Sequence, residues 1–276
     1  MPIHCPITLA PLTDAEFDAI DRVVMGCSYA AQNHFGRLCD ERVYENDVAT
    51  RLRAEGFADV QTQVPVTLTH EDFSKRYRFD LVVNRMLYEC KTVAAFAPEH
   101  DAQGIHYAIL GNTDRVKLLN FRSPKVVGRL LRSPLSRVDR WRIAIAQDRW
   151  QPLSERCPAL VERMTALLGD WGAFLEARLY EEALVHFFGS KARCERRLQV
   201  TRDGLELGTH KLACHADDVG FVVTALAREM AAYEIQIQRL LRSLPLRGIQ
   251  WLNLNHAELQ LVTLCYGNGK GMGAKE

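Results

Sequence analysis

The 276-residue sequence lacks several features that mark common protein classes. Its eight cysteines are scattered and form no CxxC pair, so neither a zinc ribbon nor a cysteine-ligated iron–sulfur cluster is expected. No GxGxxG or GxxxxGK[ST] motif occurs that would cradle a phosphate. No apolar run approaches the roughly 18–20 residues that cross a bilayer, and the first residues do not resemble a signal peptide. We therefore expect free thiols, a cytoplasmic location and no membrane contact.

Hydrophobic periodicity predicts an α/β or α+β unit in the first 130 residues or so. Apolar side chains recur at helical spacing in two segments, and strand-like stretches rich in Val and aromatic residues follow. A third helix and a short buried strand complete the pattern. The predicted elements are helices over 14–35 and 41–55, strands over 60–68, 75–83 and 86–93, a helix over 102–112 and a strand over 116–121.

The same order of elements recurs in the second half of the chain. An offset of 133 residues places Asn120 on Asn253, and an offset of 136 places Tyr44 on Tyr180. The change of offset falls in a loop, where deletions cost little, so we predict an internal duplication. The predicted organisation is a first domain over 1–132, a helical connection over 133–170, a second domain over 171–265 and a flexible tail over 266–276.

One hairpin carries the most informative polar residues. If Asn84 and Arg85 form a two-residue loop, Asp80 lies opposite Glu89, and Lys91 points to the same side. Two opposed carboxylates are unfavourable unless something compensates, and a bridging Mg²⁺ or Mn²⁺ does so. Such a metal activates water and neutralises charge on a phosphoryl oxygen. The alternative is a solvated charged surface on an edge hairpin.

This D-x8-E-x-K pattern resembles the motif of the PD-(D/E)XK nuclease superfamily, and two helices strengthen the resemblance. Gly36 to Tyr44 reads G-x4-E-x2-Y, which resembles the helix for which the GxxExxY proteins are named. Gln103-x3-Tyr107 resembles a helix of the RecB-like branch. The resemblance covers roughly residues 15–130. It implies restriction-endonuclease-like α/β/α units in tandem, each with a mixed central sheet flanked by helices.

The resemblance also implies roles for individual residues. Asp80, Glu89 and the backbone carbonyl of Cys90 would hold Mg²⁺ or Mn²⁺, with Lys91 at the site of attack. Glu41 would be an additional acid close to the metal. Two residues of the third helix would position the scissile strand or brace the site. The predicted catalytic residues are Glu41, Asp80, Glu89, Lys91, Gln103 and Tyr107.

The second half of the chain has none of these charged residues at the matching positions. The offset of 133 places Ala213, Val222 and Thr224 at the hairpin positions, and the offset of 136 places Ala177 at the position of Glu41. We therefore expect an active N-terminal copy and a degenerate C-terminal copy. The latter would serve packing, substrate grip or assembly, including a homodimer or a protein partner.

The small net charge of +1 conceals an uneven distribution. Residues 115–142 contain nine basic side chains and one acid, a local charge of +8, so the rest of the chain carries −7. Arginine-rich stretches of this kind contact nucleic-acid phosphates, although a solvated charged surface is the alternative. The residues predicted to bind nucleic acid are Arg115, Lys117, Arg122, Lys125, Arg129 and Arg132.

Together these features predict a Mg²⁺- or Mn²⁺-dependent deoxyribonuclease that hydrolyses DNA phosphodiester bonds in its N-terminal copy. The alternative is a non-catalytic DNA-binding or adaptor protein, in DNA repair or phage defence, that keeps the nuclease fold. RNA cleavage stays open, because no residue discriminates between the two nucleic acids.

Overall fold

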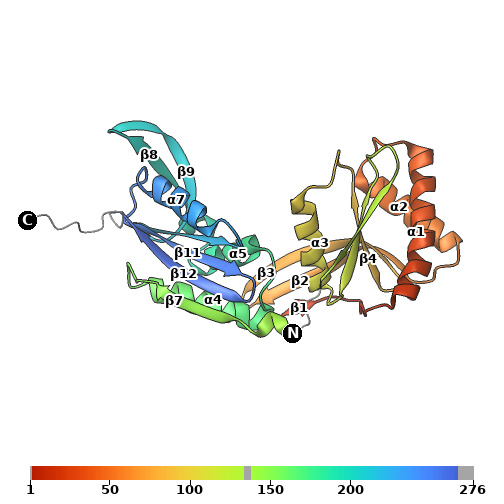
Figure 1. Cartoon of the computed structure of the whole chain (residues 1–276), viewed down its shortest axis with the longest axis horizontal. Helices are drawn as coiled ribbons and strands as arrows, with labels where there is room; N and C mark the ends of the chain where they lie inside the picture. Colours follow the sequence, from red (N-terminus) through yellow and green to blue (C-terminus); the bar gives the residue numbers. More distant parts are fainter. Residues whose placement is uncertain (1, 134–137, 267–276) are drawn as a thin grey trace, which may run out of the picture. The chain divides into compact units, whose positions relative to one another are not determined.

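The computed structural model describes residues 2–133 and 138–266, and the chain divides into two compact units (Figure 1). Unit 1 spans Met1–Arg137 and unit 2 spans Val138–Glu276. In the described residues, each unit has a six-stranded mixed sheet flanked by helices, which confirms the predicted tandem α/β fold. The predicted flexible tail lies almost entirely outside the described residues. All eight cysteines are free, as expected.

The sheet of unit 1 has the strand order β1-β2-β3-β4-β5-β6. Strands β4 and β5 are parallel and all other neighbours are antiparallel, because α3 forms the crossover that a parallel pair requires. Helices α1 and α2 lie on one side of this sheet and α3 on the other (Figure 1). The elements are β1 Ile3–His4, α1 Asp14–Phe35, α2 Glu41–Ala54, β2 Val60–His70, β3 Phe73–Val83, β4 Met86–Lys91, α3 Pro98–Leu110, β5 Arg115–Asn120 and β6 Val127–Arg132.

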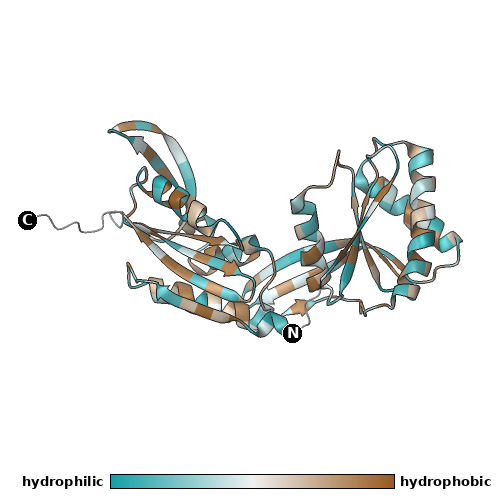
Figure 2. Ribbon diagram, in the orientation of Figure 1, coloured by the Kyte–Doolittle hydropathy of each residue, from teal (hydrophilic) through white to brown (hydrophobic). Residues whose placement is uncertain are grey.

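Local sequence signals define the two helices that carry one side of the core. Thr13 and Glu16 form a capping box at the start of α1, and Gly36 ends that helix with a positive φ of 73°. The apolar positions of both helices are buried against the sheet. Figure 2 accordingly shows α1 and α2 as ribbons of mixed teal and brown, as expected for helices with one buried face. The first two predicted helices are thus confirmed.

Unit 2 repeats this order of elements. Its sheet runs β8-β9-β10-β11-β12, with β10 and β11 parallel around the crossover helix α7, and β7 adds to the far edge beside β12. The elements are a short 3₁₀ helix Asp139–Trp141, β7 Ala144–Arg149, α4 Cys157–Trp171, α5 Ala177–Phe187, α6 Lys191–Cys194, β8 Glu195–Arg202, β9 Leu205–Ala216, β10 Val219–Thr224, α7 Met230–Leu241, β11 Gly248–Asn255 and β12 Glu258–Cys265.

Two sets of hydrogen bonds between a side chain and the backbone occur in both units at matching positions. The Asn120 carboxamide accepts a hydrogen bond from the backbone N–H of Val93 and donates one to its carbonyl. Asn253 makes the same two contacts with Leu226. Both asparagines lie at the end of the parallel strand pair, where they fasten the segment that follows the hairpin.

The second set is a hydrogen bond that joins the first two helices of each unit. The hydroxyl of Tyr44 donates to the carbonyl oxygen of Gly36 at 2.8 Å, and the hydroxyl of Tyr180 donates to that of Gly172. Both glycines end a helix, with φ of 73° and 74°. These are the pairs that the 136-residue offset connects.

The predicted helical connection over 133–170 is wrong in detail. Residues Ala144–Arg149 form β7, an edge strand of the second sheet, and Cys157–Trp171 form α4, which precedes α5 as α1 precedes α2. The strand was missed because five of its six side chains are exposed, so it has no apolar alternation.

The hairpin of unit 2 differs from that of unit 1 by a register shift. Phe221 pairs with Ala213, whereas a constant offset from unit 1 requires Cys214. A bulge at the turn of β9 and β10 causes this shift. Leu212, not Ala213, therefore occupies the place of Asp80.

Candidate active site

The six residues predicted to be catalytic line one pocket of about 580 Å³ in unit 1. They are supplied by α2, β3, β4 and α3, and the first and last of them, Glu41 and Tyr107, are 66 positions apart in the sequence. We call this cavity the unit 1 pocket. Its lining consists of Glu41, Pro65, Thr67, Arg76, Tyr77, Arg78, Asp80, Glu89, Lys91, Gln103 and Tyr107.

The hairpin between β3 and β4 sets the position of the first carboxylate. Asn84 and Arg85 form the predicted two-residue turn, and both have the positive φ that such a turn requires. The backbone pairing stops one residue before Asp80, so the predicted direct cross-strand pair with Glu89 does not form. The Asp80 carboxylate instead accepts a hydrogen bond from the backbone N–H of Cys90 at 2.9 Å.

Glu89 and Lys91 form a buried ion pair at the base of the pocket. The Lys91 Nζ lies 2.7 Å from Glu89 Oε1, and Glu89 is only 2% exposed. Burial and the charge of Asp80 raise the pKa of Glu89 well above its ordinary value. Burial lowers the pKa of Lys91, but the surrounding carboxylates outweigh it and hold that pKa above its ordinary value. Lys91 therefore stays charged.

The second oxygen of Glu89 is the clearest sign of an incomplete site. Oε2 is buried and has no hydrogen-bond partner among the described residues. A buried carboxylate oxygen without a donor is costly, so its retention calls for a ligand.

Two helices bring the remaining predicted residues to the pocket. Glu41, the first residue of α2, accepts a hydrogen bond from the backbone N–H of Thr92 at 3.0 Å. On α3, the Gln103 carboxamide donates to the Tyr107 hydroxyl at 3.3 Å. Burial, followed by the charge of Glu89, raises the pKa of Tyr107, which therefore stays protonated.

A buried acid that the sequence did not single out for the site lies beside it. Glu45 is one helical turn beyond Glu41 and 3% exposed, and burial together with the charge of Asp80 raises its pKa to about 7. The Gln63 carboxamide donates to Glu45 at 2.8 Å and to Asp80 at 3.2 Å. Gln63 has a positive φ of 55° within β2, a strained conformation for this residue type. The four-residue spacing between Glu41 and Glu45, which places both on one face of a helix, is the sequence signal that could have identified Glu45.

The donor set fits a hard divalent cation that is held partly by its substrate. Within residues 2–133 and 138–266, no three His, Cys, Asp or Glu side chains form a metal-binding group. Mg²⁺ is commonly bound by one or two carboxylates together with waters and substrate phosphates. Asp80 and the unpartnered oxygen of Glu89 supply that smaller set.

Four of the six residues predicted to bind nucleic acid are engaged within unit 1. Asp14 pairs with both Arg115 and Arg132, while Lys117 pairs with Asp21 and Arg129 pairs with Asp101. These acids belong to α1 and α3, and they offset part of the local positive charge of the basic stretch. Arg122 and Lys125 are exposed to solvent. Their binding of nucleic acid stays a prediction.

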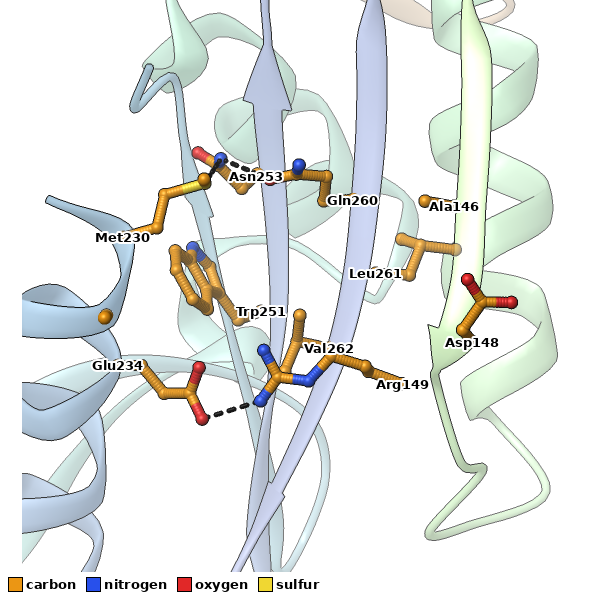
Figure 3. Close-up of a pocket in the computed structure, with 11 residues that line it drawn as sticks. Ala146, Asp148, Arg149, Met230, Glu234, Trp251, Asn253, Gln260, Leu261 and Val262 are labelled. Carbon is orange, nitrogen blue, oxygen red and sulfur yellow. Dashed lines mark hydrogen bonds and ion pairs between the residues drawn. The ribbon is translucent and has the colours of Figure 1, made fainter. Parts of the chain in front are cut away.

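Unit 2 has a different kind of pocket, a cavity of about 360 Å³ between α7 and strands β7, β11 and β12. Figure 3 shows the Trp251 ring and the Val262 side chain facing its interior, with Arg149 paired to Glu234 at one end. At the other end Asn253 contacts Met230 and Gln260. Its two carboxylates do not converge as those of unit 1 do: Glu234 is paired and Asp148 lies on the opposite wall.

Residues 18–131 match the PD-(D/E)XK nuclease superfamily, and this segment includes every residue that lines the unit 1 pocket. The match supports a nuclease-type function for unit 1. Searches of curated proteins and of solved structures found no match to the chain. Among the described residues, no helix is long and apolar enough to cross a membrane.

Proposed function

We propose that unit 1 is a metal-dependent nuclease that hydrolyses phosphodiester bonds of DNA. The observation that carries this proposal is the convergence of six predicted catalytic residues on one pocket within the segment that matches the nuclease superfamily. A solvated charged hairpin does not account for a buried Glu89–Lys91 pair with an unpartnered carboxylate oxygen.

In this proposal the pocket holds Mg²⁺ or Mn²⁺ through Asp80, Glu89 and the backbone carbonyl of Cys90, with Glu41 close by. When bound, the metal supplies an activated water and neutralises charge on the phosphoryl oxygens. The carboxylates of this chain gain a counter-charge that relieves the cost of burying Glu89 beside Asp80.

Lys91 contributes a fixed positive charge at the floor of the pocket. Its charged state is secured by the neighbouring carboxylates, so it can stabilise negative charge that develops on the phosphate during attack. Gln103 and Tyr107 are hydrogen-bonded to each other on α3 and would orient the strand being cut.

We further propose that unit 2 is a degenerate copy of unit 1 that arose by duplication and no longer cuts. Its shared element order, and its matching asparagine and tyrosine contacts, support common origin. Leu212, Val222 and Thr224 stand where unit 1 has Asp80, Glu89 and Lys91. This unit would contribute substrate grip or assembly with a second copy or another protein.

The test is fragment release from end-labelled single-stranded and duplex DNA and RNA, with Mg²⁺, Mn²⁺ or EDTA. Wild type is compared with Asp80→Ala and Lys91→Ala. We expect metal-dependent release by wild type and loss of it in both variants. Release that neither substitution alters would refute the assignment. Salt-sensitive binding without cleavage would favour the non-catalytic alternative.

A further inference from the structure

Two arginines of β3 line the unit 1 pocket without belonging to its predicted catalytic set. Arg76 and Arg78 are exposed and lie two residues apart, so both point to the same side of the strand. Their directly paired neighbours on β2 are Thr67 and Pro65, and these residues also line the pocket. The two guanidinium groups therefore lie at one wall of the cavity that contains Asp80.

These arginines differ from Arg115, Lys117, Arg129 and Arg132, the paired members of the basic stretch, in having no acidic partner. Within the described parts of the chain, the side chain of neither Arg76 nor Arg78 forms an ion pair or a hydrogen bond with a protein group. Arg115 and Arg132, by contrast, share Asp14. A guanidinium that is already paired must give up its carboxylate before it can bind a phosphate, whereas an unpaired one need not.

The pocket is otherwise rich in negative charge. Glu41, Asp80 and Glu89 face a cavity whose buried cation, Lys91, is already paired. A nucleic-acid strand that approaches these carboxylates needs a local positive charge to offset the repulsion of its phosphates. Arg76 and Arg78 are the residues of the lining that can supply it.

The second unit does not keep this pair. With the register shift between β9 and β10, the residues at the places of Arg76 and Arg78 are Gly208 and His210. The loss of both guanidinium groups accompanies the loss of the carboxylates, as expected if the arginines serve the same substrate.

We propose that Arg76 and Arg78 bind the phosphate backbone of the nucleic-acid strand next to the bond that is cut. This inference rests on the proposed nuclease function of unit 1. In this proposal the two arginines bind the substrate and take no part in the chemical step. The main phosphate contacts of the site are then made by β3 and not by residues 115–132.

The test measures binding of a fluorescent single-stranded DNA to the full chain in EDTA, across a range of KCl concentrations. Arg76→Gln/Arg78→Gln should reduce the slope of log K against log salt by about 1.4, since each phosphate contact to a single strand contributes about 0.7. Arg76→Lys/Arg78→Lys keeps the charge and should restore the slope. Arg22→Gln/Arg37→Gln removes the same charge from exposed positions of unit 1 outside the pocket and should leave the slope unchanged.

A parallel assay of cleavage in Mn²⁺ separates this inference from the nuclease assignment. The double glutamine variant should raise KM by about tenfold or more with kcat nearly unchanged, because it removes uniform binding. A reduced salt slope supports the inference even if wild type does not cut. An unchanged slope in a folded variant overturns it even if wild type cuts. A wild-type chain that does not bind DNA, or a larger loss of slope in Arg129→Gln/Arg132→Gln, also overturns it.

Discussion

The two units of this chain keep the same architecture and differ in the residues that carry charge. Both fasten the parallel strand pair with an asparagine, Asn120 or Asn253, and both close the helix corner with a tyrosine, Tyr44 or Tyr180. Unit 1 adds a buried carboxylate that has an unpartnered oxygen, whereas unit 2 has Val222 at that position. The residues that the two units share stabilise the fold, whereas the residues in which they differ line the unit 1 pocket.

The two units also differ in how closely the crossover helix packs against its sheet. In unit 1, Gly104 lies so close to the sheet that an added Cβ would meet Leu131 at 2.7 Å and Leu118 at 3.1 Å. The matching residue of unit 2 is Ile237, which is itself buried in the core. The helix that carries Gln103 and Tyr107 thus sits tightly against its sheet. In unit 2 a pocket lies between α7 and strands β7, β11 and β12.

Among the substitutions made at matching positions of the two units, the largest effect is expected from Glu89→Gln. The amide keeps the shape and can still accept from Lys91, but it removes the charge that would hold the metal. Cleavage in Mg²⁺ should fall by about 10²–10³-fold or more. Val222→Leu at the matching position of unit 2 should leave the rate within about twofold. A folded Glu89→Gln variant that cleaves within tenfold of the wild-type rate would contradict the distinction between a catalytic unit 1 and a degenerate unit 2.

Gly104→Ala should destabilise unit 1 by about 1–3 kcal/mol, because the new methyl group overpacks the contact of α3 with the sheet. The contacts are with side-chain ends that can partly yield, which sets the lower bound. Urea unfolding followed by circular dichroism measures the change. Gly169→Ala on α4, where an added Cβ meets nothing within 4 Å, is the control and should not destabilise. Equal stability of both variants with wild type would contradict the tight-packing account.

Glu45→Gln and its counterpart Glu181→Gln test whether the buried Glu45 serves the site while the half-buried Glu181 does not. Burial raises the pKa of both carboxyls, that of Glu45 to about 7. The contribution of a neutral Glu45 to stability is present below pH 4.5 and is lost as pH rises through about 7. Glu45→Gln should therefore remain stable above pH 7, where wild type weakens.

The two variants should differ in activity. Glu45→Gln should lower cleavage by about tenfold, because Gln63 links this side chain to Asp80. Glu181→Gln should leave the rate unchanged. Equal effects on cleavage from the two substitutions would mean that Glu45 has no link to the site. Rates measured from pH 6 to pH 9 for both variants decide the matter.

The smallest effects are expected from Tyr44→Phe and Tyr180→Phe. Each removes one hydroxyl that donates to a glycine carbonyl at a helix end, so each should cost about 1 kcal/mol of unfolding free energy. Because the contact is structural in both units, neither substitution should change kcat by more than about twofold. A large loss of kcat in Tyr44→Phe alone would mean that Tyr44 contributes to catalysis and is not only a structural residue.

Much of unit 1 could be predicted because its signals are local. Apolar periodicity and Gly36 located the helix that carries Glu41, and the Asn84-Arg85 turn located the hairpin. The divergence of β3 from β4 at Asp80 could not be predicted, since no local pattern marks it and the contacts of the Asp80 side chain are with Gln63 on β2 and the backbone of Cys90 on β4.

The basic stretch illustrates a different limit. Its charge is visible in the sequence, but Asp14 and Asp21, which pair with three of its residues, lie about a hundred residues earlier. Only the fold brings them together. Arg76 and Arg78 escaped notice for the opposite reason, because two arginines in a strand form no conspicuous run.

The most direct measurement is the rate at which the full chain releases fragments from end-labelled DNA in Mn²⁺, for wild type and for Asp80→Asn. The account predicts release that EDTA abolishes and that Asp80→Asn reduces to background while the variant remains folded. Release that persists undiminished in Asp80→Asn would contradict it, because the cleavage would then arise somewhere other than the unit 1 pocket.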